Sequence, residues 1–105
     1  MTPILWTNTA RADLRSLHAY IARDARLYAR RIVGRVERSV ERLRQFPESG
    51  EIVPEWDHPE VREVLVASFR VIYRWRGHSV EILSVIHAAR QLPGHDPGLE
   101  EGMGP

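Results

Sequence analysis

The chain of 105 residues contains no cysteine, no lysine and no long run of hydrophobic residues. The absence of cysteine excludes a disulfide scaffold, a thiolate zinc site and a cysteine nucleophile. The apolar runs are too short to cross a bilayer, and the N-terminal segment lacks the basic and apolar regions of a signal peptide. We therefore expect a soluble, cytoplasmic protein with no membrane association. A chain of this length fills one modest core, which predicts a single domain.

All 15 basic residues are arginine, and 14 acidic residues leave a formal net charge of +1. This total is well below the excess that sequence-independent nucleic-acid binders carry, so it does not identify a partner. The charges are unevenly distributed along the chain. Residues 1–46 hold ten arginines and four acidic residues, whereas residues 47–105 hold five arginines and ten acidic residues.

Motifs that bind phosphate, dinucleotides or metal ions are absent. The chain has no glycine-rich phosphate loop, no serine elbow and no helix with paired histidines. Its five histidines are scattered, and none has a second ligand at suitable spacing on a shared helix face. We therefore expect neither a cofactor nor a metal site.

The first half of the chain has the pattern of a short strand followed by two helices. Residues 4–6 are apolar and precede a cluster of helix-capping residues, which predicts a strand and then a helix over about 8–23. Asp24 is expected to cap a second helix, which runs until Phe46 and Pro47 because proline cannot continue it. The short link between the helices predicts an antiparallel hairpin.

The second half has the alternation of β-strands. Residues 61–67 read as one strand, and residues 69–76 and 79–87 as a hairpin closed by Gly77 and His78. This two-residue loop places Arg74 opposite Glu81. The fold class is therefore α+β, with an N-terminal strand and a helical hairpin on one face of a small, mainly antiparallel sheet. We assign the domain to residues 1–93 and expect the glycine- and proline-rich residues 94–105 to be poorly ordered.

The same register predicts a polar site on the sheet. One face of the hairpin is almost wholly apolar and must lie against the helices, while Arg70 lies on the other face, diagonal to His87. Imidazole titrates near neutral pH, and guanidinium groups around it suit a phosphodiester. The simpler interpretation is that a backbone carbonyl holds the histidine and that the arginine is solvated. Arg62 joins Arg70 if the loop at residues 67–68 is bulged, but lies on the Phe69 side if that loop has two residues.

A cationic stripe follows the second helix. Arg31, Arg35, Arg38 and Arg42 recur at a helical spacing, so they share one face and repel one another. Glu37 and Glu41 are expected to offset part of that repulsion through i,i+3 contacts. The stripe is either a solvated face or a docking surface for an acidic partner or nucleic acid.

Several short motifs together resemble one protein family. They are A-x-x-D-L at the start of the first helix, L-x-x-F-P-x-x-G at the end of the second, V-R-E, F-R-V-I-Y-R and the final H-A-A-R. With these motifs, residues 4–93 resemble the RelE/ParE superfamily of toxins from bacterial type II toxin-antitoxin systems. The resemblance implies a helical hairpin on a small antiparallel sheet. The long hairpin and the FPESG segment look closer to ParE.

The resemblance implies a toxin that inhibits DNA gyrase and is neutralised by a co-encoded antitoxin, ParD-like with a ribbon-helix-helix domain or similar, in a hetero-oligomer. The antitoxin tail is expected along the hairpin and sheet edge, with acidic residues meeting the stripe. Arg31, Arg35, Arg38, Arg42 and Arg90 are therefore the candidates for antitoxin or target binding.

The alternative that the resemblance implies is a RelE-like, metal-independent endonuclease that cuts ribosome-bound mRNA. In that case Glu55 or His87 acts as base and acid around a 2′-hydroxyl, and Arg62 and Arg70 hold the scissile phosphate. Ala88 and Ala89 stand after His87 where such nucleases often have an aromatic residue. The lysine-rich surface of ribosome-cutting members is also absent.

Overall fold

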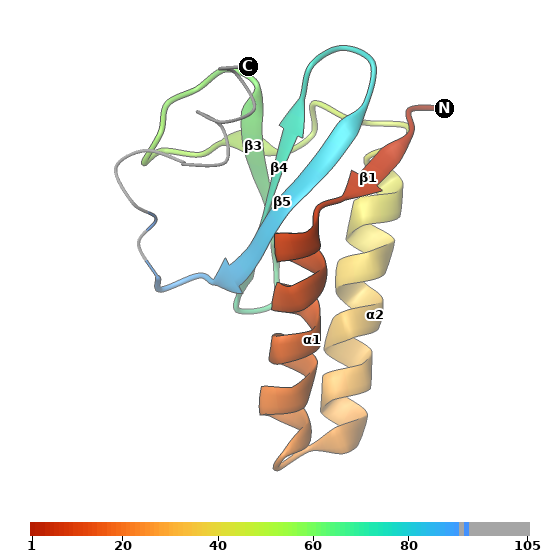
Figure 1. Ribbon diagram of the computed structural model, residues 1–105, viewed down its shortest axis with the longest axis vertical. Helices are drawn as coiled ribbons and strands as arrows, with labels where there is room; N and C mark the ends of the chain where they lie inside the picture. Colours follow the sequence, from red (N-terminus) through yellow and green to blue (C-terminus); the bar gives the residue numbers. More distant parts are fainter. Residues whose placement is uncertain (91, 93–105) are drawn as a thin grey trace.

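Two helices cover one face of a five-stranded sheet (Figure 1). The computed structural model describes residues 1–90 and 92. Its elements in chain order are β1 (Ile4–Trp6), α1 (Asn8–Ala22), α2 (Arg26–Arg42), β2 (Glu51–Ile52), β3 (Val61–Val66), β4 (Phe69–Trp75) and β5 (Val80–His87). The predicted tail at residues 94–105 lies outside the described residues.

The sheet has the strand order β1-β5-β4-β3-β2. β1 runs parallel to β5, whereas the three other neighbouring pairs are antiparallel. This arrangement confirms the predicted α+β class, with β2 as an added short edge strand. Neither helix within residues 1–90 and 92 is long and apolar enough to cross a membrane.

The helix boundaries follow local capping with two differences from expectation. The side chain of Thr7 accepts a hydrogen bond from the Ala10 amide and caps α1. Asp24 does not cap α2, since its amide still bonds to the Ile21 carbonyl in the last turn of α1, and Ala25 takes the capping position. α2 ends at Arg42, earlier than predicted, because the residues ahead of Pro47 form a turn instead of helix.

The main core lies between the helices and the sheet. Its buried residues come from both helices, from the residue that follows α2, and from β3, β4 and β5: Ala10, Leu17, Ile32, Val36, Val40, Leu43, Val66, Val71, Tyr73, Val80, Ile82 and Val85. The apolar stripes of the two helices thus meet each other and one face of the sheet. This packing confirms the predicted antiparallel hairpin on a single sheet face.

The other face of the sheet is partly covered by a loop. Val53, Val61 and Ile72 form a second buried cluster, against which Trp56, Leu83 and Leu92 pack. The sequence predicts that this face holds the polar groups. That prediction is incomplete, because the loop after β2 places apolar side chains on the face. The face is therefore a second small core with charged residues beside it.

A bulge changes the predicted register of the β4–β5 hairpin. Arg74 pairs with Glu81 as expected, and Gly77 in the loop has a positive φ of 93°. Beyond Tyr73 the register shifts by one residue, so Phe69 pairs with His87. The carboxylate of Asp13 on α1 accepts hydrogen bonds near this bulge from the Ser84 hydroxyl, at 2.7 Å, and the Val85 amide, at 2.9 Å. The prediction that Arg70 and His87 share a face is therefore wrong.

The β3–β4 connection decides the position of Arg62. Val66 pairs with Phe69 across a two-residue loop, in which Ala67 has a φ of 52°. Arg62 consequently pairs with Tyr73 and lies on the Phe69 side of the sheet, away from Arg70. Of the two positions considered for Arg62, the structure adopts the one that a two-residue loop requires.

The buried hydroxyl of Tyr73 ties the loop after α2 to the sheet. It donates a hydrogen bond to the Pro47 carbonyl at 2.8 Å and accepts one from the Gly50 amide at 2.9 Å. A Cβ atom at Gly50 would lie 2.6 Å from the Glu63 carbonyl oxygen, so the loop approaches the sheet as closely as only glycine allows. Burial raises the pKa of Tyr73.

Replacing Tyr73 by phenylalanine should lower the free energy of unfolding by about 1–3 kcal/mol, because it leaves a buried amide and carbonyl without partners. Tyr28→Phe is the matched control, since Tyr28 is exposed. Urea denaturation of both variants measures the effect. Equal midpoints for Tyr73→Phe and Tyr28→Phe would show that these hydrogen bonds do not stabilise the fold.

Candidate functional site

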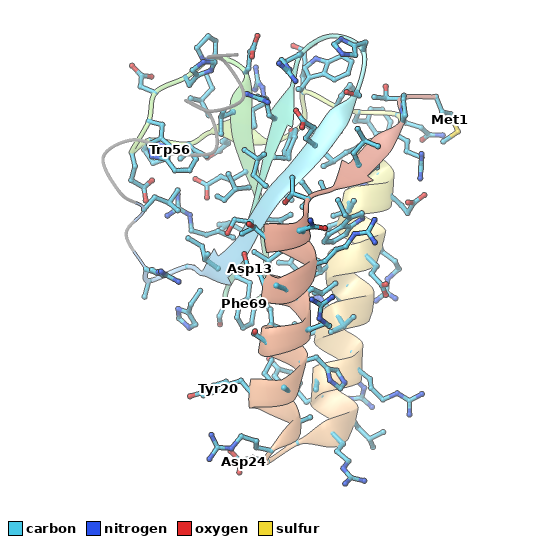
Figure 2. All side chains as sticks on the ribbon, viewed as in Figure 1. Met1, Asp13, Tyr20, Asp24, Trp56 and Phe69 are labelled. Carbon is cyan, nitrogen blue, oxygen red and sulfur yellow. The ribbon has the colours of Figure 1, made fainter. Side chains whose placement is uncertain are left out.

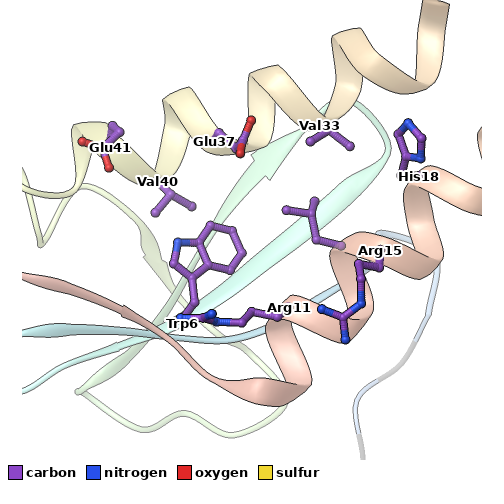
Figure 3. A pocket seen from close by; sticks show the side chains of 9 residues that line it. Trp6, Arg11, Arg15, His18, Val33, Glu37, Val40 and Glu41 are labelled. Carbon is purple, nitrogen blue, oxygen red and sulfur yellow. The ribbon is translucent and has the colours of Figure 1, made fainter. Parts of the chain in front are cut away.

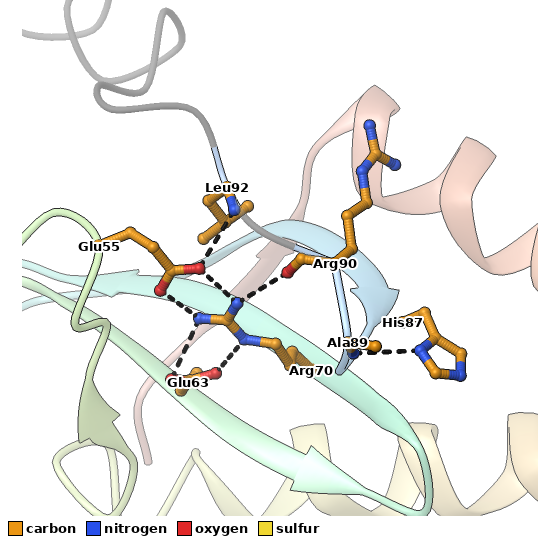
Figure 4. Close-up of polar contacts among 7 residues, drawn as sticks. All are labelled: Glu55, Glu63, Arg70, His87, Ala89, Arg90 and Leu92. Atoms are coloured by element: carbon orange, nitrogen blue, oxygen red, sulfur yellow. Dashed lines mark hydrogen bonds and ion pairs between the residues drawn. The ribbon is translucent and has the colours of Figure 1, made fainter.

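Arg70 lies between two glutamates on the sheet face that the helices do not cover (Figure 4). Its two terminal nitrogens donate to both oxygens of Glu55, at 2.6 and 2.7 Å. Its Nε donates to Glu63 on β3, also at 2.6 Å. Arg70 further donates to the Arg90 carbonyl, and the Leu92 amide donates to Glu55. We call Arg70, Glu55 and Glu63 the arginine clamp.

The arginine clamp is nearly inaccessible to solvent. The side chain of Arg70 is 8% exposed, and those of Glu55 and Glu63 are 12% and 13% exposed. The hydrogen bonds from Arg70, assisted by the Leu92 amide, lower the pKa of Glu55 to about 2. The two carboxylates in turn raise the pKa of Arg70. Glu55 and Arg70 are therefore both charged at neutral pH, and Glu63 forms a second ion pair with Arg70.

The other candidates for nuclease chemistry lie elsewhere. His87 is exposed at the end of β5, where its Nδ1 accepts a hydrogen bond from the Ala89 amide and its ring contacts Phe69 edge-on, at 5.6 Å between centroids. Arg62 donates to the Gly50 carbonyl at 2.9 Å on the helix side of the sheet. The structure thus brings Glu55 to Arg70 but brings neither His87 nor Arg62 to them.

Within the described residues, the arginine clamp offers a phosphodiester neither a base suited to neutral pH nor a free guanidinium group. A carboxylate with a pKa of about 2 is a weak base at neutral pH, because catalytic bases work best with a pKa near the operating pH. Arg70 is already bound by two carboxylates, so it has no free pair of donors for a phosphate. In the described part of the chain, no group of three or more histidine and acidic side chains could hold a metal ion.

The arginine stripe on α2 is exposed along its whole length. Arg31, Arg35, Arg38 and Arg42 are exposed, and none of them makes an ion pair with another described residue. Glu41 pairs with Arg44 instead, at 2.8 Å, so the expected compensation by Glu41 is wrong. The repulsion within the stripe is therefore left for an external partner or counter-ions to offset. Arg90 lies after β5, and its backbone carbonyl serves the arginine clamp.

A groove between the two helices is a further surface that the sequence reading missed (Figure 3). Its volume is about 750 Å³. Trp6 from β1, Leu14 from α1, and Val33 and Val40 from α2 supply its apolar lining. We call it the interhelical groove. Its apolar residues are partly those of the helix stripes, which is why periodicity assigned them to the core.

The walls of the interhelical groove carry opposite charges. Arg11, Arg15 and His18 line it from α1, whereas Glu37 and Glu41 line it from α2. On α1 these residues recur at i, i+4 and i+7, a spacing that marks a basic wall in the sequence itself. An apolar floor between charged walls suits an amphipathic helix whose polar flanks carry the complementary charges.

Comparisons with known proteins agree on one relationship. Residues 4–92 match the family model described as "ParE toxin of type II toxin-antitoxin system, parDE". The chain is 35% identical over 91 residues to "Putative toxin Y4kP" of Sinorhizobium fredii, covering 86% of this chain and 92% of that protein. It is 32% identical over 91 residues to "Toxin RelE2" of Caulobacter vibrioides, covering 86% and 99%.

A solved structure has the same fold. A chain of "Chromosomal ParDE TA system from P. aeruginosa" matches with a TM-score of 0.70 and 24% sequence identity. The match covers 83% of this chain and 96% of that chain.

The arginine clamp predicts a specific dependence of stability on pH. The pKa of Glu55 falls from 4.5 to about 2 on folding, so its stabilisation is present above about pH 4.5 and is lost as the pH falls toward 2. Glu55→Gln should lower the free energy of unfolding at pH 7 by about 2 kcal/mol. The difference from the parent protein should shrink in acid.

Glu51→Gln is the control, since Glu51 is exposed on the edge strand β2. Chemical denaturation at a series of pH values checks both variants. A pH-independent loss in Glu55→Gln would mean that the ionised carboxylate is not what stabilises the clamp.

Proposed function

The chain belongs to the ParE toxin family of type II toxin-antitoxin systems, and we propose that it inhibits DNA gyrase by binding to it. With gyrase as its target, the toxin would act in the cytoplasm. The observation that supports binding over cleavage is the arginine clamp. In the clamp, Glu55 and Glu63 neutralise Arg70, the residue that would otherwise hold a phosphate. The separation of His87 and Arg62 from the clamp supports the same conclusion.

We further propose that a co-encoded antitoxin neutralises the toxin through the interhelical groove, in a toxin-antitoxin hetero-oligomer. A ParD-like antitoxin with a ribbon-helix-helix domain fits the family of this chain. The groove offers an apolar floor and two charged walls, so an antitoxin helix would place apolar residues on Trp6 and Leu14, acidic residues toward Arg11 and basic residues toward Glu37.

Gyrase inhibition can be measured with purified components. Added to a supercoiling reaction, the toxin should reduce supercoiled product and accumulate linear DNA, and it should leave ribosome-bound mRNA intact. His87→Ala should retain at least about half of this inhibition, since His87 lies apart from the arginine clamp. Cleavage of the mRNA by the toxin, abolished in His87→Ala, would instead establish the nuclease function and overturn the proposal.

The role of the groove in antitoxin binding can be tested by reversing the charge of one wall. Replacing Arg11 and Arg15 together by glutamate should raise the Kd of the antitoxin complex by at least about tenfold, because acidic antitoxin residues would then face like charges. Both arginines are exposed, so folding should be preserved. Titration calorimetry measures the affinity, and Arg76→Glu at the far hairpin loop is the control. Unchanged affinity in the double variant would show that the antitoxin does not bind in this groove.

A further inference from the structure

The end of the helical hairpin exposes three large apolar side chains. Tyr20 on α1 is 72% exposed, and Leu27 and Tyr28 on α2 are 68% and 52% exposed. The hairpin extends past the end of the sheet, so the helices there have only each other to pack against (Figure 1). Leu27 and Tyr28 are adjacent on α2, and contiguous exposed apolar groups are characteristic of interaction sites.

The apolar hairpin end is continuous with the arginine stripe. Leu27 precedes Arg31 by four residues, and Tyr28, Arg31 and Arg35 follow the i, i+3, i+7 spacing of one helix face. We call the exposed residues on this face the outer face of α2: Leu27, Tyr28, Arg31, Arg35, Arg38 and Arg42. It combines an apolar end with four guanidinium groups.

Tyr20 lies on α1 and projects from the side of the hairpin away from α2, so it is not part of this surface (Figure 2). Asp13 bonds to β5, so its side of α1 faces the sheet, and Tyr20 lies two turns further along the same side. Figure 2 shows Tyr20 projecting below the level of Asp13 and Phe69. The tyrosine therefore lies beyond the end of the sheet, where most of its surface is exposed.

The outer face of α2 is separate from the interhelical groove. Val33, Glu37 and Val40 line the groove, and at 100° per residue they lie on the side of α2 away from the stripe, whereas Glu41 lies at the border between the two surfaces. One helix in the groove cannot also cover the stripe. The two surfaces can therefore serve two partners.

We propose that the outer face of α2 is the surface through which the toxin binds its target protein, and that it contacts an acidic target surface bordered by an apolar recess. Arginine and tyrosine are the residues most often responsible for affinity at protein interfaces, and arginine binds carboxylates with a planar pair of donors. A second copy of this chain is a poor partner, because two arginine stripes would repel each other. The identity of the target as gyrase rests on the proposed function, but the location of the surface does not.

The test uses two sets of variants of the full chain. Arg35→Glu with Arg38→Glu, and Leu27→Ser with Tyr28→Ser, change the outer face, whereas Arg11→Glu with Arg15→Glu changes only the groove. Circular dichroism and the Tm verify folding. Growth arrest on induction without antitoxin should fall by at least about tenfold in both outer-face variants, while their Kd for antitoxin stays within about twofold. The groove variant should keep its toxicity and lose antitoxin affinity.

Purified gyrase holoenzyme then separates the two proposals. Outer-face variants should bind it at least about tenfold more weakly than the parent toxin. If the parent toxin itself does not bind gyrase but outer-face variants lose toxicity, the proposed function fails and the surface assignment stands. Full toxicity in the outer-face variants overturns the assignment, as does a loss of antitoxin affinity instead of target affinity.

Two other partners for the outer face of α2, DNA and a second copy of the chain, are tested in the same experiment. Duplex DNA without protein, measured by fluorescence anisotropy, should bind the parent and outer-face variants equally. Sedimentation of the parent toxin should show no dimer that the variants lose. Binding of DNA, or self-association, that depends on the outer face would replace the acidic protein partner and overturn the proposal.

Discussion

The guanidinium group of Arg70 holds together the side of the sheet that the helices leave uncovered. It joins β4 to Glu63 on β3, to Glu55 in the loop after β2 and to the Arg90 carbonyl after β5. A buried charge is stable only with such partners, so the clamp fixes the loop and the segment after β5 over the second apolar cluster. The same contacts pair the Arg70 guanidinium group with two carboxylates, so it is not available to bind a phosphate. The contacts that stabilise this face of the sheet are therefore the same ones that support our proposal of binding over cleavage.

The helical hairpin, by contrast, leaves most of its charged groups exposed. One side of α2 faces a groove with an apolar floor and oppositely charged walls, and the other presents four arginines that no described side chain neutralises. A toxin that must bind both an antitoxin and a target can use these two sides independently.

Local patterns were sufficient to predict much of the fold. The helices follow from apolar periodicity, the start of α1 from the Thr7 cap, and the β4–β5 turn from Gly77. The bulge near Leu83 could not be foreseen, because near it the Asp13 carboxylate on α1 accepts from Ser84, a contact between residues 71 apart in the chain. That single shift reverses the side on which His87 lies.

The candidate site shows the same limit. Glu55 and Arg70 were both identified from sequence, but their mutual ion pair depends on how the loop after β2 folds back onto β4. The sequence does not predict the groove, because its floor residues on the helices have the same periodicity as core residues. Exposure, which separates a groove from a core, is a property of the packed helices and sheet, and no local pattern specifies it.

The central claim is that this toxin acts by binding and not by cutting RNA. Incorporation of labelled thymidine and labelled leucine, followed in one culture after induction without antitoxin, tests it directly. The account predicts that DNA synthesis falls first while protein synthesis continues. An immediate arrest of protein synthesis ahead of DNA synthesis would contradict it.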